Sequence, residues 1–118
     1  MKMNKKIAPH YKWGTDCDGW LLADHPAFSV IEERMPAHTK EVRHYHTNAR
    51  QFFYILSGTA TLEVEGKYIE LSPQDGIEIA PLTIHQMMNR TDHELSFILF
   101  SSPSTRGDRK VSPKNNLL

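Results

Sequence analysis

The sequence has little cysteine, no long apolar run and no excess of charge of either sign. Cys17 is the single cysteine among 118 residues, so no disulfide within the chain is expected. No stretch approaches the roughly 18 apolar residues that a membrane-spanning helix needs. Fourteen Lys and Arg residues balance fourteen Asp and Glu residues, which removes the broad attraction that nucleic acid or an anionic membrane would require. We therefore expect a cytoplasmic protein without nucleic-acid or membrane partners.

Helical periodicity is also missing. No window of ten or more residues repeats its apolar positions every 3.6 residues, whereas short β-rich runs end at turn residues and recur every 8–12 residues, roughly. This pattern predicts an all-β sandwich or barrel. One domain over 1–118 is expected, with a barrel core at about 19–101 and a C-terminal tail, 102–118, as a surface strap or frayed end. The expected strands cover 19–22, 28–35, 41–46, 51–56, 59–64, 68–71, 77–80, 84–89 and 94–101.

Three of the seven histidines have informative places. His44 and His46 are two positions apart in an expected strand, so both rings leave the same face with Cα atoms ~6.5–7 Å apart. Both rings can then reach one cation. Gln51 opens the next strand after a short turn, and His85 follows a distant turn at 81–83. Together these four residues form a candidate metal site if the barrel brings their strands together.

Each of these residues also has a plainer interpretation. The two side chains of a His-x-His pair in a strand often only face solvent, and glutamine is ordinary at a strand start. No general base is indicated by any motif. Residues expected to be solvated or without a role are His10, His25, His38, His93, Tyr54, Glu63, Glu78 and, as an inert thiol, Cys17.

The stretch from His38 to Asn89 resembles the two sequence motifs of the cupin superfamily. The first motif, G-x5-H-x-H-x3,4-E-x6-G, aligns its residues with His38, His44, His46, Gln51 and Gly58. The second motif, G-x5-P-x-G-x2-H-x3-N, aligns with Gln74, Ala80, Leu82, His85 and Asn89. Three motif glycines are thus replaced by His38, Gln74 and Leu82, and histidine is among the residue types tolerated at positive φ. Gln51 replaces the acidic ligand of the family.

The resemblance implies a double-stranded β-helix, the cupin or jelly-roll barrel, with a metal inside. The ligands would be His44, His46, Gln51 and His85, and this mixed nitrogen and oxygen set suits Fe, Mn, Ni, Cu or Zn. Strand alternation from the ligands then directs Tyr45 outward. The residues expected to face inward by the same rule are Val42, Phe53, Ile55, Met87 and Asn89.

The resemblance leaves three classes of function open. The first is a metal-binding cupin that acts on a small oxygenated molecule, as a dioxygenase or as a sugar isomerase-like enzyme. The alternative is a non-catalytic module that binds a sugar or organic acid. The third is an accessory domain that works by dimerising. A homodimer is expected in any case, because open sheet edges favour pairing, and Trp13 and Trp20 are candidates to be buried there.

Overall fold

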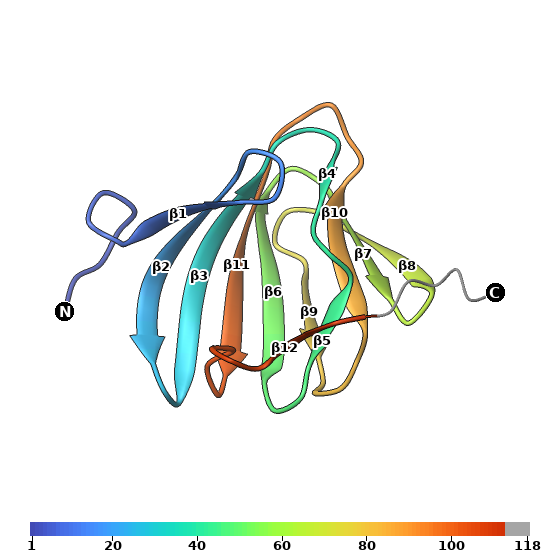
Figure 1. Ribbon diagram of the computed structural model, residues 1–118. Coiled ribbons are helices and arrows are strands. Elements are labelled where there is room, and N and C mark those ends of the chain that lie inside the picture. Colours follow the sequence, from blue (N-terminus) through green and yellow to red (C-terminus); the bar gives the residue numbers. More distant parts are fainter. Residues whose placement is uncertain (113–118) are drawn as a thin grey trace.

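Residues 1–112, the part of the chain that the computed structural model describes, consist of strands joined by turns and irregular segments, with no helix among them (Figure 1). This confirms the all-β prediction, and no helix that could cross a membrane occurs among these residues. The strands are β1 (His10–Trp13), β2 (Cys17–His25), β3 (Phe28–Met35), β4 (Thr39–Lys40), β5 (His44–His46), β6 (Arg50–Ser57), β7 (Ala60–Val64), β8 (Lys67–Leu71), β9 (Gly76–Ile79), β10 (His85–Asn89), β11 (Leu95–Ser102) and β12 (Arg109–Val111).

The strands form two antiparallel sheets that enclose the interior. One sheet has the order β1-β2-β3-β11-β6-β9, and the other has the order β12-β5-β10-β7-β8, with β4 also paired to β10. From β3 to β11 the chain passes back and forth between the sheets, which is the double-stranded β-helix that the resemblance predicted (Figure 1). Residues far apart in sequence therefore share one interior.

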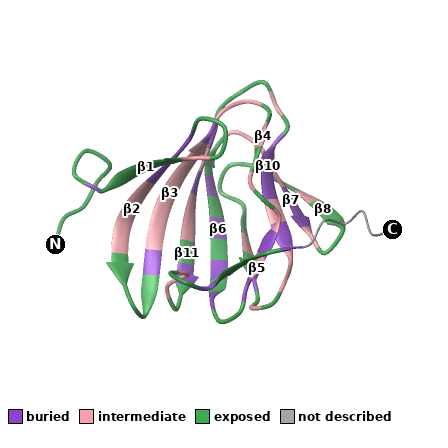
Figure 2. Cartoon of the chain, in the orientation of Figure 1, coloured by how far each residue is buried: buried purple, intermediate pink, exposed green. Residues whose placement is uncertain are grey.

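Alternation along the strands decides which side chains enter that interior. In β6, Phe53 and Ile55 are buried whereas their neighbours Phe52 and Tyr54 are exposed (Figure 2). Met87 and Asn89 are buried as well. These four inward positions were predicted correctly from the alternation.

The prediction that Val42 faces inward is wrong, because its side chain is 54% exposed. Of the expected strand 41–46, only 44–46 forms a strand, β5; β4 ends at Lys40, before the expected strand begins, and residues 41–43 between the two lie outside any strand. Period-two alternation does not hold across this break. The backbone N–H of Glu41 instead donates to the Met87 carbonyl at 3.0 Å, and the Glu41 side chain enters the interior.

Positive φ is retained at every place where the family's glycines have been replaced. The values are 59° at His38, 73° at Gln74 and 68° at Leu82. These turns thus keep the left-handed backbone that glycine adopts without strain, at a cost of about 1 kcal/mol each for a residue with a Cβ.

The two sheets extend beyond the expected core of 19–101. β1 pairs with β2 at the N-terminal side, and β12 pairs with β5 inside the segment expected to be a tail. Residues 113–118 of that tail lie outside the described residues. The C-terminal segment is therefore part of a sheet as far as it is described.

Candidate functional site

His44, His46 and His85 come together at one end of the interior. His44 and His46 leave the same face of β5, and His85 in β10 is the direct register partner of His44. Ligand nitrogens of the three rings lie within 4.8 Å of one another. All three side chains are buried. The structure thus brings together the three histidines singled out in the sequence.

The rings of His44 and His85 are oriented by the backbone. Nδ1 of His44 lies 2.8 Å from the Val42 carbonyl, and Nδ1 of His85 lies 2.9 Å from the Thr83 carbonyl. One nitrogen of His44 and one of His85 are therefore held by main chain, which leaves Nε2 of each ring as a lone-pair donor.

Three buried polar atoms among the described residues have no hydrogen-bond partner at this place. They are Nδ1 of His46, Nε2 of His85 and Oε1 of Gln51. The other amide atom of Gln51, Nε2, donates to Ser101 Oγ at 3.1 Å, which directs the amide oxygen away from that bond. Buried acceptors without partners are unfavourable, and a bound cation would satisfy all three. The residues present therefore fit a divalent metal.

The histidines are also in the protonation state that a metal requires. Burial, followed by the neighbouring His85, lowers the pKa of His44 to about 3 and that of His46 to about 4. Burial likewise lowers the pKa of His85. All three rings are neutral at pH 7, so no proton has to leave before a metal binds.

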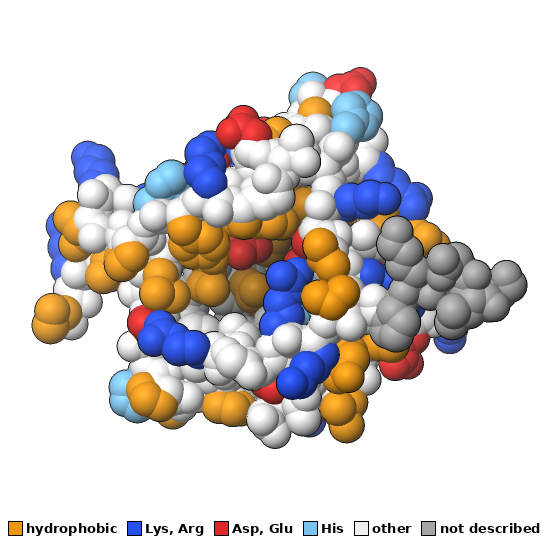
Figure 3. All heavy atoms as spheres, viewed as in Figure 1, with side chains coloured by type: hydrophobic (Ala, Val, Ile, Leu, Met, Phe, Trp, Pro, Cys, Tyr) orange, Lys and Arg blue, Asp and Glu red, His pale blue; other side chains and the backbone are white. Residues whose placement is uncertain are grey.

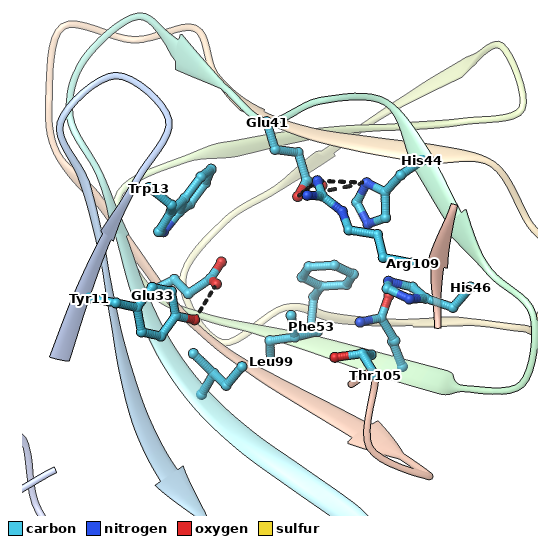
Figure 4. A pocket seen from close by; sticks show the side chains of 12 residues that line it. Tyr11, Trp13, Glu33, Glu41, His44, His46, Phe53, Leu99, Thr105 and Arg109 are labelled. Atoms are coloured by element: carbon cyan, nitrogen blue, oxygen red, sulfur yellow. Dashed lines mark hydrogen bonds and ion pairs between the residues drawn. The ribbon is translucent and has the colours of Figure 1, made fainter. Parts of the chain in front are cut away.

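The cluster opens into a cavity of about 210 Å³. Figure 3 shows the hollow in the middle of this face, with apolar atoms at its rim and acidic and basic side chains inside. Figure 4 shows His44, His46 and Arg109 on one side, with Tyr11 and Glu33 on the other. The lining residues are Tyr11, Trp13, Ile31, Glu33, Glu41, His44, His46, Gln51, Phe53, Leu99, Thr105 and Arg109.

Two carboxylates in this cavity were missed in the sequence, where no general base was indicated. Burial and the charge of Glu41 raise the pKa of Glu33 to about 8, and burial raises that of Glu41 to about 7. Alternation in the predicted strand 28–35 could have indicated that Glu33 faces inward, because Glu33 lies two positions from Met35 on the same face. Glu41 had no such signal, since it lies in the irregular segment 41–43.

Asp108 and Arg109 reach the site from the C-terminal segment. The Asp108 carboxylate accepts backbone N–H bonds from Thr47 at 2.9 Å, Asn48 at 3.0 Å and Ala49 at 2.9 Å, in the turn between β5 and β6. Nη2 of Arg109 lies 4.0 Å from Oε1 of Glu41 across the cavity mouth. Arg109 therefore adds a positive charge that the sequence did not indicate.

The other residues singled out in the sequence are not part of the histidine cluster. Glu63 was expected on the surface but is buried, because Arg43 binds both of its carboxylate oxygens at 2.7 and 3.0 Å. Trp13 lines the cavity, and Trp20 lies under the Lys5 ammonium at 4.5 Å. Cys17 is buried. The exposed positions, as expected, are His10, His25, His38, His93, Tyr54 and Glu78.

Known proteins share this fold and part of this sequence. The chain is 33% identical over 58 residues to quercetin 2,3-dioxygenase of Bacillus subtilis (strain 168), which covers 49% of the chain and 17% of that relative. It therefore spans less than a fifth of that relative's length. A predicted oxalate decarboxylase from Thermotoga maritima superposes with a TM-score of 0.80 at 15% identity, covering 87% of this chain and 99% of that one. Streptomyces PAC13 with uridine gives 0.80 at 12% identity, covering 95% and 90%. The sequence model of the Cupin domain matches residues 31–101, so the chain belongs to the cupin family.

Proposed function

We propose that this cupin binds one divalent transition-metal ion and transforms a small oxygenated molecule in the cavity. One observation carries this proposal: a ring nitrogen of His46, a ring nitrogen of His85 and the amide oxygen of Gln51 are buried without hydrogen-bond partners, and His46 and Gln51 line the cavity. His44 completes the set through the geometry of the cluster. The proposed ligands are therefore His44, His46, Gln51 and His85.

A ligand set of three imidazoles and one amide oxygen suits Fe, Mn, Ni, Cu or Zn. Such an ion supplies a Lewis acid that polarises an oxygen of the bound molecule. Arg109 at the mouth adds a positive charge for an anionic group, and Phe53 and Leu99 give the cavity an apolar floor. These features support a small organic acid or a sugar acid as ligand.

The size of the cavity limits that ligand. About 210 Å³ is below the ~300 Å³ at which pockets begin to hold drug-sized molecules. A compact molecule of few heavy atoms is therefore favoured over a polycyclic one such as the substrate in the dioxygenase's name. The carboxylates of Glu33 and Glu41 in the wall favour proton transfer, as in isomerisation, over oxygenation.

Metal analysis of purified protein tests the proposal. We expect about one equivalent of a divalent transition metal, and its loss in a His44→Ala/His46→Ala double variant. The matched control is a His25→Ala/His93→Ala double variant, which removes two exposed histidines and should keep the metal. Equal metal content in both double variants would rule out the assigned ligands.

A second measurement separates an enzyme from a binding module. Mass spectrometry of the purified protein identifies any retained ligand, and incubation of the metal-loaded protein with that ligand follows its conversion and any oxygen uptake. Conversion without oxygen uptake is expected. A retained ligand that stays unchanged would favour the non-catalytic alternative.

We also propose a homodimer in the cytoplasm. One buried cysteine and no disulfide among the described residues support a reducing compartment. The dimer has support in the outer face of the β1-containing sheet, where the aromatic side chains of Phe28, Phe52 and Phe100 are exposed. A contiguous apolar surface on a small protein is typical of an interaction site.

A further inference from the structure

Tyr11, Gly19 and Glu33 form one row across three neighbouring strands. Tyr11 of β1 is the register partner of Gly19 of β2, and Gly19 is the register partner of Glu33 of β3. A Cβ atom on Gly19 would lie 2.3 Å from Cζ of Tyr11, so the tyrosine ring occupies the space that any side chain there would fill. Tyr11 thereby passes over β2, and its hydroxyl donates to Oε2 of Glu33 at 3.4 Å.

This row lies on the wall of the cavity that faces the histidines. In Figure 4 the Tyr11–Glu33 pair is on one side and His44, His46 and Arg109 are on the other, with Phe53 between them. A molecule that fills the cavity therefore touches the Glu33 carboxylate with one end and the histidine side with the other.

Most of the titratable groups near Glu33 are acids, and no basic side chain among the described residues is paired with it. The titratable and charged groups that face it are Tyr11 from β1, Cys17 from β2, Glu41 and Arg109. Among residues 1–112 no Lys, Arg or His forms an ion pair with Glu33, whereas Arg109 lies 4.0 Å from Glu41. Burial and Glu41 together raise the pKa of Glu33 to about 8, so the group exists in both protonation states near neutral pH. A structural carboxylate would be paired instead.

We propose that Glu33 is the catalytic acid–base of this cavity, that Tyr11 is its positioning residue, and that the substrate is a small enolisable oxo acid. The inference rests on the proposed function. The Glu33 carboxylate takes a proton from the carbon next to the substrate carbonyl. The C–H electron pair forms the carbon–carbon double bond of the enolate, and the carbonyl π pair moves onto the oxygen that faces the histidines. Glu33 then returns a proton to carbon, so no oxidant or reductant is consumed.

Solvent deuterium exchange tests this assignment with pyruvate as the probe. The zinc-loaded protein in D₂O should exchange the methyl protons of pyruvate, seen as loss of their NMR signal, faster than zinc ion alone at equal concentration. Glu33→Gln should slow this exchange by about 100-fold or more, the usual contribution of a general acid or base. The matched control is Glu32→Gln, one residue along β3 on the outer face, where Glu32 pairs with Lys5 at 3.1 Å. It should exchange at the wild-type rate.

Tyr11→Phe and Gly19→Ala test the positioning. The Tyr11 hydroxyl stabilises the carboxylate and lowers the pKa of Glu33, so losing that bond should move the midpoint of the pH–rate profile upward. Gly19→Ala displaces the tyrosine ring and should have the same effect. A purely structural role for Tyr11 would lower the rate without moving the midpoint.

The outcomes separate the two proposals. Absence of any bound divalent transition metal in the wild-type protein, zinc included, would overturn the proposed function. Stoichiometric zinc together with equal exchange by wild type and Glu33→Gln would overturn the role of Glu33 alone. Stoichiometric zinc with no exchange above that of free zinc would overturn the oxo-acid substrate class.

Discussion

The amide of Gln51 stands where the cupin motif has an acidic ligand, and this one residue sets the charge of the site. Gln51→Glu adds a negative oxygen ligand to three neutral imidazoles, so we expect metal affinity to rise about tenfold or more, equivalent to about 1.4 kcal/mol or more. Binding of pyruvate should weaken, because the site becomes less positive. Competition titration with zinc measures the first effect, and pyruvate titration of the zinc-loaded protein measures the second.

A matched change elsewhere controls for charge alone. Gln74→Glu makes the same substitution in an exposed turn and should leave both affinities unchanged. Equal zinc and pyruvate affinities for wild type and Gln51→Glu would show that the amide only bonds to Ser101 in the barrel wall.

Glu33 makes the stability of the metal-free protein depend on pH. Its pKa is raised to about 8 in the folded state against about 4.3 in an unfolded chain. The folded state therefore binds more protons between these values, and stability falls as pH rises through that window. Relative to Glu33→Gln, the wild type should lose about 1–2 kcal/mol between pH 5 and pH 8, less than the full shift implies because the cavity is open to solvent. Urea denaturation at both pH values measures it, and a constant difference would contradict it.

At the scale of elements, the β5–β6 turn depends on a side chain from the C-terminal segment. Burial alone would raise the pKa of Asp108, but three backbone N–H donors outweigh it and lower the pKa. Asp108→Asn keeps the shape and removes the charge, so we expect about 1–2 kcal/mol lower stability. Zinc affinity should also fall several-fold, because His46 and Gln51 flank this turn. Calorimetry gives both values.

Asp92→Asn is the control for this variant. Asp92 is exposed and bonds to His38 at 2.7 Å, far in sequence from the β5–β6 turn. Unchanged zinc affinity in Asp108→Asn would show that the turn does not position the ligands.

A substitution in the turn before β9 should increase the stability of the protein. Gln74 holds a φ of 73°, and glycine adopts this region without strain. Gln74→Gly should therefore raise the free energy of unfolding by about 0.5–1 kcal/mol. Glu70→Gly, at an exposed position inside β8, should lower it by a similar amount. Chemical denaturation distinguishes the two, and a loss in both would contradict the strain at Gln74.

Local alternation and turn residues predicted most strands, as the correct span 28–35 and the inward Phe53 and Ile55 illustrate. The motif spacing predicted that three histidines would converge. Residues 41–43 were mispredicted because they leave the ladder after β4, where alternation carries no information. The place of Arg109 in the cavity could not be predicted from the sequence. Its strand, β12, has three residues and no pattern of its own, and it is held by contacts with β5 and the β5–β6 turn.

At the scale of the molecule, the outer face of the β1-containing sheet exposes large aromatic side chains on neighbouring strands. Phe52 and Phe100 are cross-strand partners in β6 and β11, and both are about 40% exposed. We expect this face to bury against a second copy, with Phe100→Lys shifting the protein from dimer to monomer in sedimentation experiments at about 50 μM, a concentration at which a micromolar dimer is largely formed. A charge on an outward side chain should leave folding intact. Tyr68→Lys, an exposed aromatic in the other sheet, is the control. A monomeric wild type would contradict the proposed dimer.

Residues 109–111 share backbone hydrogen bonds with the strand that holds His44 and His46. β12 is at an edge of its sheet, so its amides open to solvent with a small free energy, as edge segments commonly do. A ligand that binds only the closed form of β5 lowers the population of the open form by mass action. Amide hydrogen exchange of β12 should therefore slow in proportion to the occupancy of the histidine site, which gives a label-free measure of binding from a strand that supplies none of the proposed metal ligands.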